Sequence, residues 1–445
     1  MNHKISRRRL LQLTGAAMTT GLLAGCAHGT NTSRTLNQVQ VKVPAQYKGR
    51  KHTISFWSSY AGVNGKLLNQ LVDRYNQSQS NTYVDIEYQG DYLPTIAKIK
   101  TALQSGHGPD VTIVAPDKAA GSLLLSDLMS PLDDYFDQDF LSSFVPVFMK
   151  EWQLNGKTYQ IPFSRSLPLL YYNRDVFAHA GLPDRGPNSW DELRRWNSAL
   201  KGIENGGKPV RMELLGPNPW LYQSKIWAFG GNLSKGMEMT MDQDGCLACA
   251  EWISDLVGSK ISFVGDFPDD FNNGFAATMV SSTANLKGVE EAAKFRVGTS
   301  KLPRGKSSHP EPTGGGGWMM LTGVPDDRKG AAADMIKFFG TTESSLDWAL
   351  GTGYVPVVNT ALKSSRVRSK IKSDGNFETA ISEISDSHFP DAVMGFIGDG
   401  DTVLTQAVGD MFAARKDPKA TLEQAAQRLT DEAKPLKAKY DKYFG

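Results

Sequence analysis

In the first third of the chain, short apolar runs typical of strands alternate with segments whose apolar residues recur at helical spacing. Short apolar runs predict strands at residues 52–57, 83–88 and 110–115. Apolar residues at helical spacing predict helices between them, at residues 66–77 and 93–104. Strands that alternate with helices are typical of an α/β fold with a parallel or mixed sheet and helices on both faces. Ligands bind beyond the carboxyl ends of such strands, so we expect binding residues in the loops at residues 58–64, 89–92 and 116–118.

A denser pattern follows in the middle of the chain. The apolar run at residues 167–172 predicts a buried strand, and a short amphipathic helix ending near Gly181 follows it. Residues 183–187 contain two prolines and a glycine, which predict a turn. Ser189 and Glu192 then form a capping-box pattern, which predicts the start of another helix.

The remainder of the chain is mainly helical by the same criteria. From Trp190 to about Gly258 we expect helices, and from Arg328 to the end helices again dominate. Between these regions, strands are predicted at residues 276–280 and 295–302. Four consecutive glycines follow a polar loop, and we expect this run in a loop or at a hinge.

The block after Pro162 matches a known family signature. The matching residues are Tyr171-Tyr172-Asn173-Arg174, Phe177, Ala180-Gly181-Leu182, Pro187, Ser189-Trp190 and Glu192-Leu193. The block resembles the family 1 extracellular solute-binding proteins, the binding subunits of sugar-type ABC importers. The resemblance implies an α/β fold with two lobes, of the maltose-binding-protein type, and a ligand cleft between the lobes. It implies no particular ligand.

A chain of 445 residues exceeds one ordinary domain, which agrees with two lobes that have separate cores. The resemblance implies that the chain crosses between lobes near Phe163, Thr313 and Ser345. We therefore expect an N-terminal lobe at residues 53–162 plus 314–345 and a C-terminal lobe at residues 163–313 plus 346–445. We expect the protein to be a monomer.

The first 25 residues have the features of an export signal. Ser6-Arg7-Arg8-Arg9-Leu10-Leu11-Gln12 resembles a twin-arginine motif, and the apolar run after it is too short for a membrane span. Leu23-Ala24-Gly25-Cys26 resembles a bacterial lipobox, in which the cysteine thiol carries the lipid. We expect a lipoprotein anchored to a membrane through Cys26, with residues 26–52 as a tether, in the periplasm or at the cell surface. The alternative is an ordinary cleaved signal with a chance cysteine.

Charge gives no indication of a nucleic-acid partner. The whole chain carries 49 basic and 47 acidic side chains, a formal charge of +2. Four of the basic residues belong to the leader, which contains no acid, so 45 basic and 47 acidic side chains remain after residue 25. A nearly neutral mature protein has no electrostatic basis for binding nucleic acid.

Catalytic and metal-binding motifs are absent from the sequence. We find no G-x-S-x-G, no H-E-x-x-H and no phosphate-binding P-loop, and the seven histidines lack metal-ligand spacing. We therefore expect no enzyme activity, no cofactor and no metal. A secreted hydrolase would need a paired acid and base that the sequence does not display. Cys246 and Cys249 have no second pair that would complete a zinc site, and they are either packing residues of a helix or a disulfide.

A closer resemblance covers roughly residues 53–440. The supporting stretches are Phe56-Trp57-Ser58-Ser59, Gln89-Gly90-Asp91-Tyr92, Pro162-Phe163-Ser164-Arg165-Ser166, Gly230-Gly231, Thr313-Gly314-Gly315 and Thr352-Gly353-Tyr354-Val355-Pro356. They resemble the branch of the family that binds glycerol-3-phosphate and glycerophosphodiesters. Carried over by position, the resemblance implies ligand contacts from Tyr92, Asp117, Ser166, Trp220, Ser282, Gly315 and Tyr354.

The implied roles follow from what a hydroxyl-rich ligand needs. Asp117 would accept hydrogen bonds from ligand hydroxyls, and Tyr92 and Tyr354 would donate to oxygens from opposite lobes. Trp220 would form an apolar wall, with Trp227 as a competing candidate. The two serines would supply hydroxyls, and Gly315 would offer its amide to an anionic oxygen. The alternatives are a solvated carboxylate, packing tyrosines and a simple glycine hinge.

One departure from the branch bears on the ligand. The glycerophosphate binders carry an arginine in a late loop, whereas this chain has no arginine between Arg368 and Arg415. Its absence removes a guanidinium fork for phosphate, which disfavours a phosphomonoester most. Arg165 is a candidate for the missing cation. We expect a glycerophosphodiester or sn-glycerol-3-phosphate as the ligand and an ABC permease as the partner, with an oligosaccharide as the alternative ligand.

Overall fold

The computed structural model describes residues 35–305 and 311–444 of the chain. By contacts the chain divides into Met1–Arg34 and Thr35–Gly445, and the second unit holds all the helices and strands of the described residues. The predicted signal peptide and the lipobox cysteine Cys26 lie outside the described residues. Among the residues described, no helix has the length and apolar character that a membrane span requires.

The first of two five-stranded sheets takes in the strands predicted near the start of the chain. Its order is β3 (Thr82–Tyr88), β2 (His52–Ser58), β5 (Val111–Val114), β19 (Gly314–Met320) and β8 (Ile161–Ser166). β2 pairs in parallel with β3 and β5, whereas β19 runs antiparallel to β5 and β8. The sheet is therefore mixed, and the three early strands are confirmed.

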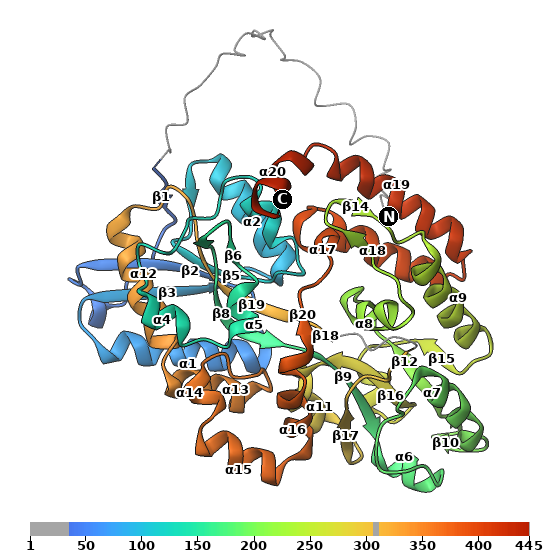
Figure 1. The fold of residues 1–445 in the computed structure, drawn as a ribbon. Coiled ribbons are helices and arrows are strands. Elements are labelled where there is room, and N and C mark those ends of the chain that lie inside the picture. The colour runs from blue at the N-terminus through green and yellow to red at the C-terminus, as the bar shows by residue number, and fades with distance from the viewer. Residues whose placement is uncertain (1–34, 306–310, 445) are drawn as a thin grey trace, which may run out of the picture. The chain divides into compact units, whose positions relative to one another are not determined.

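Helices cover both faces of this sheet (Figure 1). Leu68, Leu71 and Val72 of α1 (Gly62–Ser78) pack into one core with Ile54 and Phe56 of β2, and residues of α12 (Asp326–Phe339) join that core. Ile96 and Ile99 of α2 (Tyr92–Gln104) pack into a second core with Trp57 and Val114. These apolar positions recur at helical spacing, so each helix buries a stripe against the sheet.

The second sheet also has five strands. Its order is β15 (Ser262–Val264), β12 (Arg211–Leu215), β16 (Ala276–Ser282), β9 (Pro168–Asn173) and β17 (Val297–Ser300). All residues of β9 are buried, as the run at residues 167–172 predicted. Leu170 and Tyr172 on one face of β9 belong to a core of the second sheet's own, whereas Leu169 and Tyr171 on the other face join the core of the first sheet. Helices α6 (Arg174–His179), α7 (Trp190–Trp196), α8 (Trp220–Ala228) and α9 (Asp244–Gly258) belong to this half. The Ser189 hydroxyl accepts a hydrogen bond from Glu192 N at 3.1 Å and caps α7 as predicted.

Two segments differ from the sequence predictions. β12 lies in a region that we expected to be helical. The sequence shows no clear strand pattern there because Glu213 interrupts the apolar run. In the structure the Glu213 carboxylate is buried and bonded to Lys225 Nζ at 2.8 Å. The four glycines lie in strand β19 and not in a loop. A Cβ at Gly315 would stand 1.8 Å from Ser164 O, so glycine lets β19 approach β8 closely.

The chain crosses between the sheets at Leu167. β8 ends at Ser166 in the first sheet, and β9 begins at Pro168 in the second, with Leu167 between them. A second crossing passes through Thr313, between β18 (Glu311–Pro312) and β19. Two sheets with separate helices, joined in this way, confirm the two-lobed α/β fold. The lobe boundaries near residues 162, 313 and 345 remain predictions.

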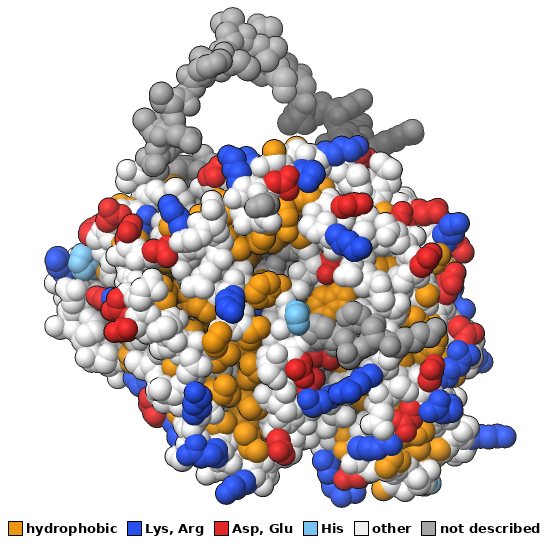
Figure 2. Space-filling view, in the orientation of Figure 1, with side chains coloured by type: hydrophobic (Ala, Val, Ile, Leu, Met, Phe, Trp, Pro, Cys, Tyr) orange, Lys and Arg blue, Asp and Glu red, His pale blue; other side chains and the backbone are white. Residues whose placement is uncertain are grey.

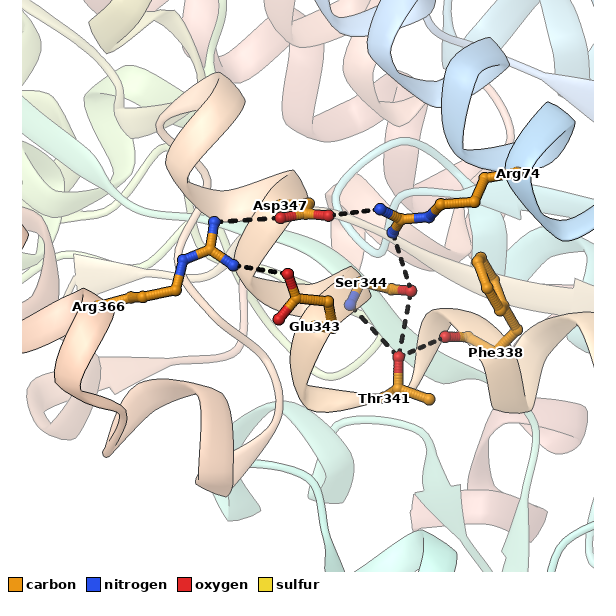
Figure 3. A network of polar contacts seen from close by, with 7 residues as sticks. All are labelled: Arg74, Phe338, Thr341, Glu343, Ser344, Asp347 and Arg366. Carbon is orange, nitrogen blue, oxygen red and sulfur yellow. Dashed lines mark hydrogen bonds and ion pairs between the residues drawn. The ribbon is translucent and has the colours of Figure 1, made fainter. Parts of the chain in front are cut away.

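A third link between the halves is α13 (Thr342–Thr352), which a surface ion-pair network holds in place (Figure 3). Asp347 of α13 accepts from Arg74 of α1 at 2.7 Å and from Arg366 of α15 (Ser365–Ser373) at 3.1 Å. Glu343 pairs with Arg366 at 2.8 Å, and Thr341 caps α13 by accepting from Ser344 N. The network joins α1 to α13 and α15, which are distant from it in sequence.

Helices of the C-terminal segment contact both lobes. They are α17 (Ala392–Phe396), α18 (Gly400–Val408), a π-turn (Gly409–Ala413), α19 (Pro418–Ala433) and α20 (Lys437–Phe444). α19 packs on α9, whereas Met394 O of α17 accepts from Ala119 N, which precedes α3 (Ala120–Leu124). Lys439 Nζ of α20 donates to Leu125 O at 2.8 Å.

Short elements complete the fold. The helices are α4 (Gln138–Ser142), α5 (Pro146–Lys150), α10 (Asp269–Asn272), α11 (Leu286–Ala292), α14 (Asn359–Leu362) and α16 (Gly375–Ser382), and the 3₁₀ turns are Ala45–Tyr47, Asn197–Leu200, Thr283–Asn285 and Ile384–Asp386. Besides β18, the two-residue strands are β1 (Asn37–Gln38), β4 (His107–Gly108), β6 (Gln153–Leu154), β7 (Lys157–Thr158), β10 (Glu204–Asn205), β11 (Lys208–Pro209), β13 (Ser234–Lys235), β14 (Glu238–Met239) and β20 (Ser387–His388).

Two further predictions can be placed in the structure. Within the segment predicted as a tether, Leu36 is buried and β1 pairs with β4, so the chain lies against the first lobe from Leu36 onward. Cys246 and Cys249 are both free and buried on α9, where they pack against apolar residues. On the face drawn in Figure 2, basic and acidic side chains are interspersed.

Candidate functional site

Three tyrosines converge beside the carboxyl edge of the first sheet. Tyr60 follows β2, Tyr92 is the first residue of α2, and Tyr354 follows α13. The hydroxyls of Tyr60 and Tyr92 are 2.5 Å apart, and the ring centroids of Tyr60 and Tyr354 are 6.1 Å apart. Trp348 stacks on Tyr354 at 5.6 Å. We call Tyr60, Tyr92 and Tyr354 the tyrosine cluster.

The tyrosine cluster is a set of hydrogen-bond donors. Burial raises the pKa of all three phenols above the usual value of 10.0, so each keeps its proton at neutral pH. The Tyr60 hydroxyl also bonds the Ser164 hydroxyl of β8, and that serine accepts from Gly316 N at 3.2 Å. The cluster is thus tied to the two strands next to the crossing.

Asp117 lies beside the tyrosine cluster, in the loop after β5. Its side chain is buried, at 4% exposure, and Oδ1 has no hydrogen-bond partner among the described residues. Burial raises the pKa of Asp117 to about 6, a shift that the Lys118 ammonium opposes. The Asp117 charge also raises the pKa of Tyr92 and of Tyr354, because it stands close to both. A buried acceptor without a partner is suited to a ligand hydroxyl or cation.

Lys118 connects this loop to the second lobe. Its ammonium forms an ion pair with Asp401 of α18 and donates to Asn218 Oδ1 at 3.0 Å. Asp117 Oδ2 lies 3.8 Å from the same nitrogen. The exposed fraction of the Lys118 side chain is 15%, so these charges interact in a largely desolvated place.

A second group of predicted residues meets at the crossing through Thr313. Trp220 is the first residue of α8, and its Nε1 donates to Thr313 O at 3.1 Å. A Cβ on Gly314 would lie 2.6 Å from the Trp220 ring and 3.0 Å from Ser166 Oγ. Trp220 and Ser166 therefore flank the start of β19, directly before Gly315, whose φ is +79°. The glycine run provides close approach between strands here.

Ser282 is already engaged within its own lobe. It ends β16, and its hydroxyl accepts from Ala284 N at 3.2 Å, which caps the turn Thr283–Asn285. Its carbonyl accepts from the Tyr171 hydroxyl at 2.6 Å. Gly353 packs against the next residue, since a Cβ there would lie 2.6 Å from Thr283 O. Ser282 thus lies near Tyr354, with a capping role of its own.

Tyr354 packs its ring against Tyr60, whose hydroxyl also bonds that of Tyr92. The neighbouring Val355 N donates to Arg165 O at 2.9 Å. Donation by Tyr92 and Tyr354 to a ligand from opposite lobes remains a prediction. Arg165 is no free cation: its guanidinium is 1% exposed and forms an ion pair with Glu151. The carboxylate of Glu151 is held in turn by the Thr313 hydroxyl at 2.8 Å.

Sequence reasoning missed four residues that the structure brings to this place, namely Tyr60, Ser164, Lys118 and Asp401. Three of them lie in stretches that the sequence pattern marks, the loops at residues 58–64 and 116–118 and the block that begins at Pro162. Asp401 carried no signal, because it pairs with a residue 283 positions away in sequence.

A groove marks the line where the lobes meet. It encloses about 300 Å³ and runs between the start of α1 and the segment that contains α11. Its lining residues include Ala61, Val63, Asn64, Ala284, Asn285 and Lys287. The first three belong to the lobe of the first sheet and the others to the lobe of the second.

Comparisons with known proteins agree with this architecture. UgpB from Mycobacterium tuberculosis, solved in complex with glycerophosphocholine, superposes with a TM-score of 0.80 at 27% identity, covering 86% of this chain and 98% of that chain. The maltose-bound MalE3 of T. maritima (TM-score 0.72, 19% identity) covers 85% of this chain and 99% of its own, and it shows the fold alone.

Sequence relatives extend over most of the chain as well. The sn-glycerol-3-phosphate-binding periplasmic protein UgpB of Escherichia coli (strain K12) is 24% identical over 403 residues, which cover 84% of this chain and 91% of that protein. The model of a family described as bacterial extracellular solute-binding protein matches residues 70–379. The chain belongs to this family of bacterial extracellular solute-binding proteins.

Proposed function

We propose that this protein captures a glycerophosphodiester in the cleft between its lobes and delivers it, chemically unchanged, to the permease of an ABC importer. The observation that carries the proposal is its similarity to the glycerophosphocholine-bound UgpB, which extends over 86% of this chain at 27% identity. The relatives named sn-glycerol-3-phosphate-binding proteins support the same class of ligand.

The chemistry of the site suits such a ligand. The tyrosine cluster offers phenol donors to phosphodiester or hydroxyl oxygens, and the unpaired oxygen of Asp117 accepts from a glycerol hydroxyl. Trp220 presents an apolar ring to the carbon skeleton, and Ser166 lies beside it. Gly315 and Ser282 are retained as candidate contacts from the crossing and from the second lobe. The proposed site therefore combines residues from both lobes.

We further propose that the protein is exported and held at a membrane by a lipid on Cys26, as a monomer in the periplasm or at the cell surface. Cys26→Ala should move the protein from the membrane fraction to the soluble fraction without changing ligand affinity. Continued membrane association of that variant would overturn the lipid anchor and leave the ligand proposal intact.

Titration calorimetry tests the ligand. We expect heat of binding with glycerophosphocholine and none with maltose. Heat with maltose alone would replace the proposal by an oligosaccharide-binding protein. Release of free choline during a long incubation would show turnover and reverse the assignment to a binding protein, so the same mixtures should be assayed for choline.

A further inference from the structure

The charged side chains of the candidate site do not balance. Asp117 and Asp401 are both buried, at 4% and 6% exposure, and one ammonium, that of Lys118, serves both. Asn218 provides the third partner of that ammonium and adds no charge. The two carboxylates and the ammonium together carry two negative charges and one positive charge.

The neighbouring charges do not correct this excess. Arg165 is paired with Glu151, so together they add nothing. Asp399, which directly precedes α18, is 61% exposed and paired with Arg428 at 2.9 Å. Lys100 bonds the Ser122 hydroxyl at 2.9 Å, and the charge acting on it is that of Asp399. The buried group of Asp117, Lys118 and Asp401 therefore keeps one net negative charge.

We infer that the Lys118–Asp401 ion pair sets the charge selectivity of the site, admitting zwitterionic glycerophosphodiesters and rejecting dianionic phosphomonoesters. The inference rests on the proposed function and narrows its ligand class. Asp401 forms an ion pair with the Lys118 ammonium, which is the cation that a phosphate dianion would need. The free oxygen of Asp117 remains as an acceptor for a hydroxyl or for a cationic head group.

The physical reason is the energy of a second negative charge in a place that water scarcely reaches. Two like charges a few ångströms apart repel far more strongly there than in water. A phosphodiester brings one negative charge, which a trimethylammonium head group balances, so the complex gains no net charge. A phosphomonoester brings about two at pH 7.5, because its second pKa is about 6.

Calorimetry on Asp401→Asn tests this assignment with glycerophosphocholine and sn-glycerol-3-phosphate as probes. In the wild type we expect glycerophosphocholine to bind at least about tenfold more tightly than sn-glycerol-3-phosphate. The variant releases Lys118 and removes one negative charge, so affinity for sn-glycerol-3-phosphate should rise by about tenfold and the preference should shrink. Asp399→Asn is the matched control, and its preference should equal that of the wild type.

The outcomes separate the two proposals. Equal affinities in the wild type, or an unchanged preference in Asp401→Asn, would overturn the inference while leaving glycerophosphodiester binding in place. Wild-type protein that binds neither probe would remove the proposed function and the inference with it.

A second measurement needs only the wild type and serves if Asp401→Asn does not fold. Between pH 7.5 and pH 5.5 the phosphomonoester loses most of its second negative charge, and most of the Asp117 carboxylate becomes protonated. The charged and titratable groups that act on Asp117 or feel its charge are Lys118, Asp401, Arg165, Glu151, Tyr92 and Tyr354. We expect the preference for glycerophosphocholine to narrow as the pH falls, and a preference independent of pH would contradict the inference.

Discussion

Asp117 is a residue at which binding and stability oppose each other. Its carboxylate is buried, and burial raises its pKa to about 6 although Lys118 lies nearby. In the unfolded chain its pKa returns to about 3.9, so above pH 6 the folded protein carries the Asp117 charge at a cost of about 3 kcal/mol. Such a cost is typical of a group kept for function.

We predict that Asp117→Asn raises the free energy of unfolding and weakens ligand binding at once. Above pH 6 the gain in unfolding free energy should be about 3 kcal/mol. It should shrink as the pH falls from 6 to 4, since the folded state then binds the proton, and vanish below about pH 4. Glycerophosphocholine affinity at pH 7.5 should fall by about tenfold or more, since the amide is uncharged.

Asp127→Asn is a suitable control for this variant. Asp127 is 77% exposed at its side chain and adopts a positive φ of 58°, which asparagine also tolerates. Urea unfolding and calorimetry should give wild-type values for it. If Asp117→Asn lowered stability and affinity together, Asp117 would be a structural residue and the proposed site would lose its main acceptor.

Tyr60 provides a second prediction about a single residue. Its hydroxyl bonds both Tyr92 and Ser164, so Tyr60→Phe removes the centre of the tyrosine cluster while its ring still packs against Trp348. We expect the dissociation constant for glycerophosphocholine to rise by about three- to tenfold, the effect of losing one hydrogen bond. Tyr222→Phe is the matched control.

Tyr222 is equally buried, and its hydroxyl donates to Gly216 O at 2.7 Å inside the second lobe. That variant should lose about 1 kcal/mol of unfolding free energy and keep its affinity. Unchanged affinity in Tyr60→Phe, measured by calorimetry, would remove Tyr60 from the binding site.

The sequence predicted part of the candidate site for identifiable reasons. Tyr92 and Asp117 lie in loops that follow strands β3 and β5, and the carboxyl ends of parallel strands meet at one edge of the sheet. Tyr354 was implied by the family resemblance alone. Tyr60 was missed because its loop holds several polar and aromatic residues with no periodicity. The partner of Arg165 was missed because Glu151 lies on a different element, and pairing of buried charges depends on tertiary structure.

At the scale of elements, periodicity identified the strands that are buried on both faces or that alternate. β2, β3, β5 and β9 were all predicted, because each presents a clear apolar run. β12 was not, since Glu213 breaks its run and becomes acceptable only through Lys225 on α8. β19 was not predicted either, since glycines give no hydrophobic pattern. The strand forms because its backbone pairs with β5 on one side and with β8 on the other.

The close approach of β19 to β8 gives a prediction at this scale. Gly315 has a φ of +79°, and an added Cβ would stand 1.8 Å from Ser164 O. Gly315→Ala should therefore force the strands apart or change the local backbone, with a loss of at least about 3 kcal/mol in unfolding free energy. Gly288→Ala is the control, since Gly288 lies in α11 with no atom within 4 Å of its added Cβ.

Alanine at position 288 should stabilise the protein by about 0.5–1 kcal/mol, because helical alanine is more favourable than glycine. Urea unfolding measures both variants. If Gly315→Ala unfolded like the wild type, β19 would tolerate a side chain at this position. The role of Gly315 would then be the contact of its amide with the ligand.

At the scale of the molecule, two lobes joined by crossings at Leu167 and Thr313 can move as bodies. A ligand that contacts both lobes binds the closed arrangement more tightly, and it therefore shifts the population towards closure. In this structure Lys118 joins the lobes through Asn218 and Asp401, and we expect these contacts to belong to the closed state. Closure is then a consequence of differential contacts in the two states.

This motion can be measured across the groove between the lobes. Val63 of α1 and Lys287 of α11 line opposite sides of it, and both side chains are about half exposed. We predict that spin labels at Val63→Cys and Lys287→Cys, in full-length protein carrying Cys26→Ala, give a broad distance distribution without ligand. Glycerophosphocholine should shift it to shorter distances, whereas buried Cys246 and Cys249 stay unlabelled.

A label pair within one lobe distinguishes closure from a local change. Lys208 and Lys287 both belong to the lobe of the second sheet, so labels at Lys208→Cys and Lys287→Cys should keep one distance with and without glycerophosphocholine. If the pair across the groove also kept one distance while calorimetry registered binding, the ligand would bind without closure. The contacts that Lys118 makes across the lobes would then be permanent, and delivery to a permease would need a signal other than lobe closure.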